Sequence, residues 1–424
     1  MKKLLTLALL LGASTSAWPQ PPTLAFLHAH IHPVLKAGTP VTETLTDGTL
    51  LVSNGKILAV GQSLAPPAGA LKLDCHGQDI FPSLIDPDST LGLSEIEAVR
   101  GGEDYQEVGD LNADRRADLA VNPDSDLLPP AMSQGILACG IAPLHGLIAG
   151  RGAVMDLHGW TREDMTVKAP SHLIVDFPSV ALDRSPDTKK PLEEQSRARS
   201  ERLDRLTEIF ENARAYGKAR KLDKVPYDTV WEAMQPYTRG EQPVFIRADS
   251  YDQIVAALQW AQRERVAIAL VGGYDASQLL DQLSLAKVPV IFTHMFETVH
   301  RELDSYDMLY RTPSLLAARG ISVSISTGGG NANVRWLREM AAVAMANGLS
   351  PWRALAAITL EPARVLGVQD HLGSLEPGKD ATFFLCNGDI LDGRTVVSRA
   401  WIRGQELDLN DRQKQLYQRY RARP

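Results

Sequence analysis

Asp88, Arg247 and His294 each follow or end an apolar, strand-like segment, and they are the residues best suited to chemistry. A carboxylate or an imidazole can accept a proton from a reacting group, and a guanidinium can bind a carboxylate through paired hydrogen bonds. In barrels of parallel strands, such groups gather at the carboxyl ends of the strands. We therefore interpret these three as candidate catalytic residues, with Asp88 or His294 as the base and Arg247 holding a substrate carboxylate.

A glycine-rich stretch, Thr327-Gly-Gly-Gly-Asn-Ala-Asn333, precedes a helix that is expected to begin at Val334. Exposed backbone amides at the start of a helix can hold an anion, and Arg335 would add positive charge. The alternative is a turn that only caps the helix through an asparagine side chain. The candidate binding residues of this stretch are Thr327, Asn331, Asn333 and Arg335.

Histidines also occur in patterns that have competing interpretations. In His28-Ala-His-Ile-His32 the histidines alternate, so on a strand they would share one face and could bind a metal. We favour a solvated or packed strand face instead, because the segment lies upstream of the expected site. His172 is expected to begin its strand and so to lie at the end opposite the site. The glycines around Arg151 are too irregularly spaced for a phosphate-binding loop.

The elements that would position these residues form an alternating pattern. Apolar strand-like runs alternate with helical stretches such as Glu193 to Lys221, which favours parallel βα units. With the run before Asp86, seven strands are clear, and we predict a distorted (β/α)8 TIM-like barrel whose eighth strand lies in 156–166 or 227–235. The other six runs are Gly135 to Pro143, Ser171 to Phe177, Pro243 to Ala248, Val266 to Val271, Val288 to Thr293 and Ile321 to Ser326.

The two ends of the chain share another pattern, with short strands and tight turns. Asn54-Gly55 is typical of a hairpin turn between strands at 48–53 and 56–61, and similar short segments return near 382–385 and 396–402. We predict a small β-sandwich built from residues 18–80 and 369–408. The barrel would occupy residues 81–368, and a helical tail would follow at 409–424.

The first residues have the layout of a secretory signal peptide. Lys2 and Lys3 precede the apolar run Leu4 to Leu11, and small residues follow as far as Ala17. This run is too short to span a bilayer, and we expect no membrane span elsewhere. We predict that residues 1–17 are removed and that the protein is periplasmic or secreted in a bacterium.

Composition narrows the class of protein. The chain has 424 residues, of which 44% are hydrophobic and 22% charged, with a formal net charge of -7. This composition supports a large folded core, and the absence of a basic stripe argues against a nucleic-acid partner. Cys75, Cys139 and Cys386 lie far apart, so an exported protein could form one disulfide or none. We expect none, since two of them lie in apolar runs.

The strand Pro82-Ser-Leu-Ile-Asp-Pro-Asp-Ser-Thr-Leu-Gly-Leu93 and the closing segments 358–367 and 372–381 together resemble the amidohydrolase superfamily. The resemblance covers nearly the whole mature chain and is nearest the imidazolonepropionase-like branch. The insertion after the first strand is similar to a periplasmic subgroup. Members of the superfamily hydrolyse C–N bonds with one or two divalent metals, held by histidines at several strand ends and an aspartate on the last strand.

At the positions that match those ligands, this chain has other residues. Asp88 and Thr90 occupy the two opening histidine positions, Arg247 and Gly272 occupy the two middle ones, and Gly328 follows Thr327 in place of the aspartate. The resemblance therefore implies no metal at this site, and zinc or another divalent ion only if the protein is an active hydrolase. We hypothesise that an ion pair between Asp88 and Arg247 stands in for the metal.

Two functions of different class follow from this pattern. The first is a non-catalytic binding or partner subunit, in a homo-oligomer or assembled with an active amidohydrolase relative, with a small molecule or peptide as ligand. The alternative is an active amidohydrolase that uses Asp88, His294 and Arg247 on a peptide or cyclic amide. In either case Thr90 belongs to the candidate binding residues.

Overall fold

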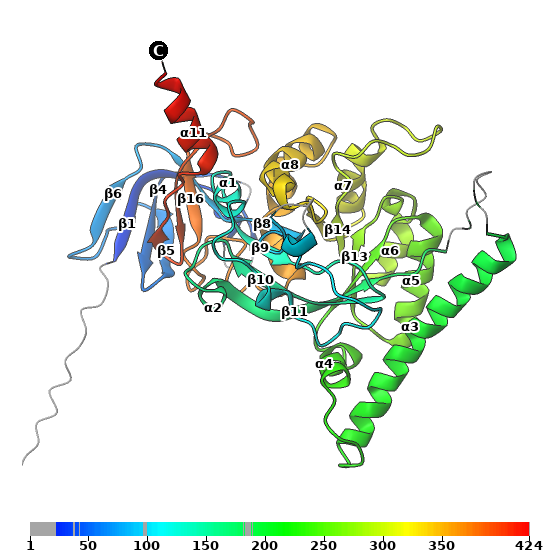
Figure 1. Ribbon diagram of the computed structural model, residues 1–424. Helices are drawn as coiled ribbons and strands as arrows, with labels where there is room; N and C mark the ends of the chain where they lie inside the picture. The colour runs from blue at the N-terminus through cyan, green and yellow to red at the C-terminus, as the bar shows by residue number, and fades with distance from the viewer. Residues whose placement is uncertain are drawn as a thin grey trace, which may run out of the picture.

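We describe the protein from a computed structural model, which describes residues 23–36, 39–41, 43–95, 100–180, 182, 188 and 190–423. The predicted signal peptide lies outside these residues. Figure 1 shows two sheets side by side, with most of the helices around the larger, barrel-shaped one.

The barrel-shaped sheet has eight strands. Its neighbouring strands run parallel except for the two pairs that β10 makes, with β9 and with β11. Its edges are joined through a short connecting segment: Ile325 donates its amide to Ala357 (2.9 Å), and Ile85 donates to Ile358 (2.8 Å). The sheet is therefore nearly closed, as the predicted (β/α)8 fold requires. In spatial order from one edge, its strands are β15 (Val323–Ile325), β14 (Val290–Phe292), β13 (Ile268–Gly272), β12 (Val244–Ala248), β11 (Thr166–Asp176), β10 (Ile148–Asp156), β9 (Ile136–Ile141) and β8 (Leu84–Ser89).

The predicted position of the eighth strand is wrong. The additional strand is β10, which is antiparallel to both β9 and β11 and overlaps the expected region 156–166 only at Asp156. Residues 229–238, in the second expected region, form a helix. This strand was not predicted because it contains Gly150 and Gly152, and glycine is not typical of a strand interior. Gly150 adopts φ +143°, and a Cβ on Gly152 would lie 2.2 Å from Nε2 of His172. Glycine is needed where another side chain approaches the backbone so closely.

The helices of the chain lie mainly outside the barrel (Figure 1), and the long helix α3 projects well beyond it. Helix α5 shows how local sequence sets their bounds: the Ser250 hydroxyl accepts a hydrogen bond from the amide of Gln253 at the start, and Arg265 ends the helix in the left-handed conformation. The α-helices are α1 (Leu128–Met132), α2 (Arg162–Met165), α3 (Leu192–Arg220), α4 (Thr229–Thr238), α5 (Tyr251–Glu264), α6 (Leu280–Ala286), α7 (Met308–Ala318), α8 (Leu337–Ala346), α9 (Pro351–Ala356), α10 (Leu360–Val365) and α11 (Arg412–Arg421).

The interior of the barrel is apolar below its mouth. Side chains from successive strands meet there, and helix α10 closes the lower end with Ala363 and Leu366. These residues are buried and form an apolar core inside the barrel. The strand residues of this core include Ile85, Ala138, Ile174, Phe245, Val271 and Ile291.

The second sheet draws its strands from both ends of the chain. The Asn54-Gly55 hairpin turn is confirmed, with φ of 51° and 75° at these residues. Phe26, Phe383 and Trp401 pack edge-to-face or stacked in the core of this sheet, with ring centroids 4.8 to 5.0 Å apart. Its strands are β1 (Leu24–Ile31), β4 (Leu45–Ser53), β5 (Lys56–Gln62), β6 (Leu71–Asp74), β7 (Asp79–Pro82), β16 (Phe383–Cys386), β17 (Val397–Ile402) and β18 (Gln405–Glu406).

Several smaller features complete the fold. Strands β2 (Leu35–Lys36) and β3 (Thr39–Pro40) form a separate pair, and 3-10 helices occur at η1 (Arg100–Gly102), η2 (Ala117–Leu119), η3 (Ala276–Gln278) and η4 (Asn331–Trp336). All three cysteines are buried and free. In the part of the chain that the structure describes, no helix combines the length and apolarity needed to cross a membrane.

Candidate functional site at the barrel mouth

The predicted contact between Asp88 and Arg247 is confirmed. Asp88 lies in β8 and Arg247 in β12, and their side chains form an ion pair with Nη2 2.9 Å from Oδ1. Nη1 of the same guanidinium lies 3.4 Å from Oδ1 of Asp176, at the end of β11, and donates to the carbonyl of Pro143 at 2.9 Å. One guanidinium is thus held by two carboxylates and a carbonyl at the carboxyl ends of the strands.

This cluster is largely shielded from water. The exposed fraction of the side chain is 19% for Arg247 and 4% for Asp88. Burial would lower the pKa of Arg247, but the charges and hydrogen bonds of Asp88 and Asp176 outweigh it and raise the pKa. Arg247 is therefore a cation whose two terminal nitrogens both donate hydrogen bonds, one of them to Asp88.

A second carboxyl, Asp86, also lies on β8, next to the Arg247 cluster. It forms hydrogen bonds with the segment after β15. It accepts a hydrogen bond from the Ser326 hydroxyl at 2.5 Å, and both the hydroxyl and the amide of Thr327 donate to its other oxygen. Asp86 has no exposed surface, and burial raises its pKa to about 6 in spite of these hydrogen bonds. The hydroxyl of Thr90 donates to the carbonyl of Gly329 at 2.5 Å. Both predicted threonines therefore make contacts that close the barrel.

His294 lies two residues beyond β14, at the expected end of the barrel. Its Nε2 is 2.6 Å from Oδ1 of Asp249, and its Nδ1 is 2.8 Å from Oε2 of Glu297. Burial alone would lower the pKa of His294, but the hydrogen bonds and charges of the two carboxylates outweigh it, so the pKa is raised. An imidazole between two carboxylates favours its cationic form, which can donate a proton but cannot accept one.

The space beside Gly272 is filled by this second cluster. Gly272 ends β13 with φ +99°, and a Cβ built on it would lie 2.2 Å from Oδ1 of Asp249. A larger residue at this position would therefore displace the Asp249 carboxylate from its contact with His294. Gly328, after β15, also has a positive φ of 76°.

The predicted binding stretch lies at the same end of the barrel but does not begin a regular helix. Residues 331–336 form the 3-10 helix η4, and the α-helix begins only at Leu337. Asn333 and Arg335 are exposed, and the Arg335 guanidinium lies over the Trp336 ring, 5.5 Å from its centroid. The side chain of Asn331 lies outside the described residues.

Four acidic residues of these clusters were not predicted: Asp86, Asp176, Asp249 and Glu297. A signal for two of them is present, because Asp176 ends a predicted strand and Asp249 is the first residue after another. The rule that polar residues at the ends of parallel strands share one face would have included both. Glu297 lies in a loop, where the strand pattern gives no guidance.

Three other histidines of the sequence analysis, His28, His32 and His172, have structural partners. His28 adopts a positive φ of 54° at an irregular point of β1 and pairs with Asp47 at 2.7 Å, while His32 stacks on Phe81 and pairs with Asp79. His172 does not begin its strand as predicted, since β11 starts at Thr166; it is fully buried against Phe245, and burial lowers its pKa to about 3. No group of three or more His, Cys, Asp or Glu side chains within the described residues is placed to hold a metal ion.

Comparison with known proteins shows what parts of the chain are similar to. The model of the amidohydrolase family matches residues 302–409, which include the closing segments. An amidohydrolase, tasK, of Hapsidospora irregularis is 20% identical over 390 residues, which is 84% of this chain. This chain spans only 39% of the length of that relative.

Solved structures share the fold over most of the chain. An amidohydrolase from Thermotoga maritima MSB8 superposes with a TM-score of 0.79 and 24% identity, covering 91% of this chain and 99% of that chain. A Xaa-Pro dipeptidase with methionine bound in its active site gives a TM-score of 0.55 at 10% identity, covering 91% of this chain and all 100% of that one. The family model thus matches residues 302–409, and the solved structures show a shared fold over most of the chain.

Proposed function

We propose that this chain is a superfamily protein whose barrel mouth works without a divalent metal, as a binding or partner subunit and not as a hydrolase. The observation that carries this proposal is Arg247, whose guanidinium lies between Asp88 and Asp176 at 2.9 and 3.4 Å. This cation pairs with both carboxylates that could have served as metal ligands and offsets one of their two negative charges.

The donor set supports the same conclusion. The resemblance implies histidine ligands, whereas the groups at the matching positions are a carboxylate, a hydroxyl, a guanidinium and bare backbone. A divalent ion a few ångströms from the Arg247 guanidinium would be repelled by several kcal/mol in a poorly solvated pocket. These residues do not fit a metal, and we derive no reaction step through one.

The test is to measure metal content and hydrolysis in the same preparation. Full-length protein purified without added zinc is analysed for bound metal and is assayed on dipeptides and on hydantoin. We expect substoichiometric metal and no turnover above a buffer blank. Stoichiometric zinc together with turnover that is lost in Asp88→Ala would refute the proposal.

An engineered variant provides the matched positive control for that measurement. Replacing Asp88, Thr90 and Arg247 with histidine (D88H, T90H, R247H) removes the cation and supplies imidazole donors at three strand ends. We expect this variant to bind more zinc than the native chain under equal zinc concentrations. Equal zinc uptake by both proteins would contradict the role given to Arg247.

One observation favours the alternative, an active amidohydrolase of peptides or cyclic amides. His294 is oriented by carboxylates on both ring nitrogens, at 2.6 and 2.8 Å, as a catalytic imidazole would need. The two carboxylates raise the pKa of His294, which favours the protonated form that a general acid needs. Under this alternative, His294→Gln would abolish any activity found in the same screen, whereas an activity that survives it would exclude this histidine.

A partner role and an exported location are further parts of the proposal. They are supported by the superfamily relationship and by the signal-like sequence that ends at Ala17. Mixing the purified chain with an amidohydrolase relative that has its histidines, from the same source, tests the first by a shift in size-exclusion elution. Sequencing the amino terminus of the mature protein tests the second, since an uncleaved Met1 would contradict export through this segment.

A further inference from the structure

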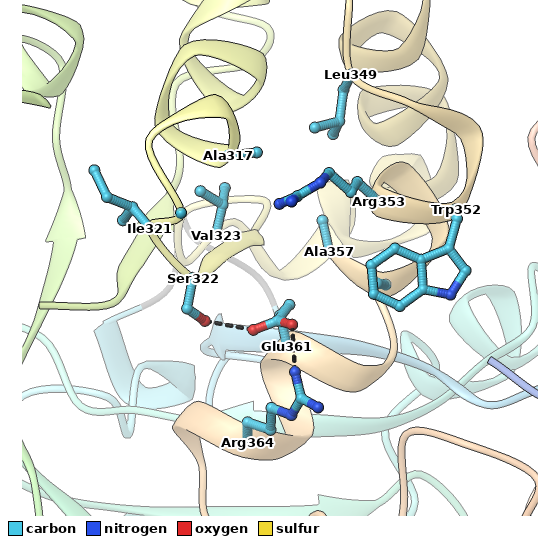
Figure 2. Close-up of a pocket in the computed structure, with 12 residues that line it drawn as sticks. Ala317, Ile321, Ser322, Val323, Leu349, Trp352, Arg353, Ala357, Glu361 and Arg364 are labelled. Carbon is cyan, nitrogen blue, oxygen red and sulfur yellow. Dashed lines mark hydrogen bonds and ion pairs between the residues drawn. The ribbon is translucent and has the colours of Figure 1, made fainter. Parts of the chain in front are cut away.

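A cavity of about 230 Å³ lies at the end of the barrel opposite the candidate site. Its lining includes Ser322 and Val323 at the start of β15, whereas Thr327 of the barrel mouth follows the end of that strand. The remaining walls come from α7, α9 and α10 (Figure 2). The cavity is therefore separate from the clusters around Arg247 and His294.

The acidic side chain in this cavity is already neutralised. The carboxylate of Glu361 accepts a hydrogen bond from the Ser322 hydroxyl, and its other oxygen accepts one from Nη1 of Arg364 at 2.8 Å. Figure 2 shows these three residues joined in a row at one side of the cavity. Glu361 is fixed there as the partner of Arg364, so this pair adds no net charge.

A second arginine leaves the cavity with an excess of one positive charge. Arg353 extends from α9 across the cavity toward Val323 (Figure 2). Within the part of the chain that the structure describes, its guanidinium forms no hydrogen bond and no ion pair. Its five N–H donors are therefore available to a ligand that enters the cavity.

The wall facing Arg353 is apolar. Ala317, Ile321, Val323 and Leu349 are buried and line the cavity, and the Trp352 ring flanks it. Nε1 of Trp352 donates to the carbonyl of Val34 at 3.2 Å, which holds the indole in place. The cavity thus combines one available guanidinium with an apolar surface and an oriented aromatic ring.

We propose that this cavity binds a small organic monocarboxylate that carries an apolar group. The carboxylate pairs with the guanidinium of Arg353, whose planar fork matches its two oxygens, and the apolar group lies against Val323 and Leu349. The size limits the ligand, because cavities that hold drug-sized molecules begin at roughly 300 Å³. A phosphate dianion is disfavoured, since only one cation is available and the Glu361 carboxylate would repel a second negative charge.

The experiment uses the full chain with benzoate and isovalerate as probes, and with isovaleramide as the neutral analogue of isovalerate. Binding is followed by saturation-transfer NMR and by calorimetry at low ionic strength, where an ion pair is least screened. We expect both carboxylates to bind and the amide to bind at least about tenfold more weakly, since charged hydrogen bonds exceed neutral ones by such a factor. Tighter binding of inorganic phosphate than of either probe, or equal binding of isovaleramide, would overturn the proposal.

Two variants locate the binding. Arg353→Gln removes the charge from an exposed side chain and should lower affinity for both carboxylates by about tenfold or more. Arg205→Gln makes the same change on α3, far from this cavity in sequence and outside its lining, and should leave the affinity unchanged. Unfolding curves confirm that both variants fold. Equal affinity of the native chain and Arg353→Gln, or no binding of either carboxylate, would refute the assignment, and neither result bears on the barrel mouth.

Discussion

Two kinds of buried acid lie side by side on β8. Asp88 shares the Arg247 guanidinium with Asp176, so its charge has a partner at 2.9 Å. Asp86 is bound only by hydroxyl and amide groups within the described residues, and burial raises its pKa to about 6. The first acid has a cationic partner, whereas the second has none in the described part of the chain and its pKa is about 6.

Asp86 therefore makes the free energy of unfolding depend on pH, and the direction of this dependence follows from its raised pKa. The unfolded chain has the ordinary value of 3.8 and the native state about 6, so between these values the native state binds more protons. The free energy of unfolding should fall as pH rises through this window, by about 3 kcal/mol in total from this group. In Asp86→Asn this part of the fall should be absent.

Urea unfolding of the native chain and of Asp86→Asn, at several pH values from below 4 to above 7, checks this prediction. The difference between the two slopes isolates Asp86 from other buried acids such as Asp156, which contribute equally to both proteins. Parallel curves would show that Asp86 does not titrate in this range.

At the scale of elements, the barrel brings the end of β12 against the end of β13. Asp249 follows β12, and its carboxylate occupies the space beside Gly272 at the end of β13, where it reaches His294. Gly272 on β13 thus leaves room for an ion pair between Asp249, in the loop after β12, and His294, in the loop after β14. This arrangement requires glycine for two reasons, the close approach and the positive φ.

Gly272→Ala should separate Asp249 from His294 and so lower the pKa of that histidine. The added Cβ would lie 2.2 Å from Oδ1 of Asp249, and φ of +99° adds backbone strain of about 1–3 kcal/mol. NMR titration of the imidazole measures the pKa directly. Gly240→Ala is the matched control, since Gly240 has φ +71° with no atom within 4 Å of its Cβ, so it tests strain alone. An unchanged His294 pKa in Gly272→Ala would contradict the packing.

At the scale of the whole molecule, an ion pair between a buried carboxylate and a partly exposed arginine joins the two sheets. Asp156, at the end of β10, pairs with Arg403 after β17 at 2.7 Å, and the same guanidinium donates to the carbonyls of Asp164 and Thr166. Only 1% of the Asp156 side chain is exposed, and burial raises its pKa to about 7 despite the arginine. The contact holds the second sheet against the barrel.

Arg403→Met should destabilise the protein by about 3–5 kcal/mol at pH 8, where it leaves a buried carboxylate unpaired. At pH 5 the loss should be smaller, since Asp156 can then take up a proton. Adding Asp156→Asn to Arg403→Met should recover part of the loss at pH 8, because no buried charge remains. Thermal unfolding of the three proteins at both pH values measures this, and a loss that is equal at pH 5 and pH 8 would exclude the ionic contribution.

Local sequence patterns were sufficient for much of this architecture. Seven barrel strands, the α3 helix and the Asn54-Gly55 hairpin follow from apolar runs, helical periodicity and turn residues, which act over a few neighbouring positions. The contact of Asp88 with Arg247, 159 residues apart, was also predictable, because strand-end residues of a parallel barrel share one face. These features could be predicted because the spacing of apolar residues indicates the strands and helices, and their alternation along the chain indicates the barrel.

The remaining features were decided by tertiary packing. Strand β10 contains Gly152, whose missing side chain leaves the space that His172 occupies, and the antiparallel direction of this strand has no local signal. The partners of Arg247 beyond Asp88, the Asp249 contact with His294 and the pair of Asp156 with Arg403 each depend on loops and on two sheets meeting. A sequence determines which side chains stand at strand ends, but their charge states and partners depend on burial, which exists only once distant segments have packed together.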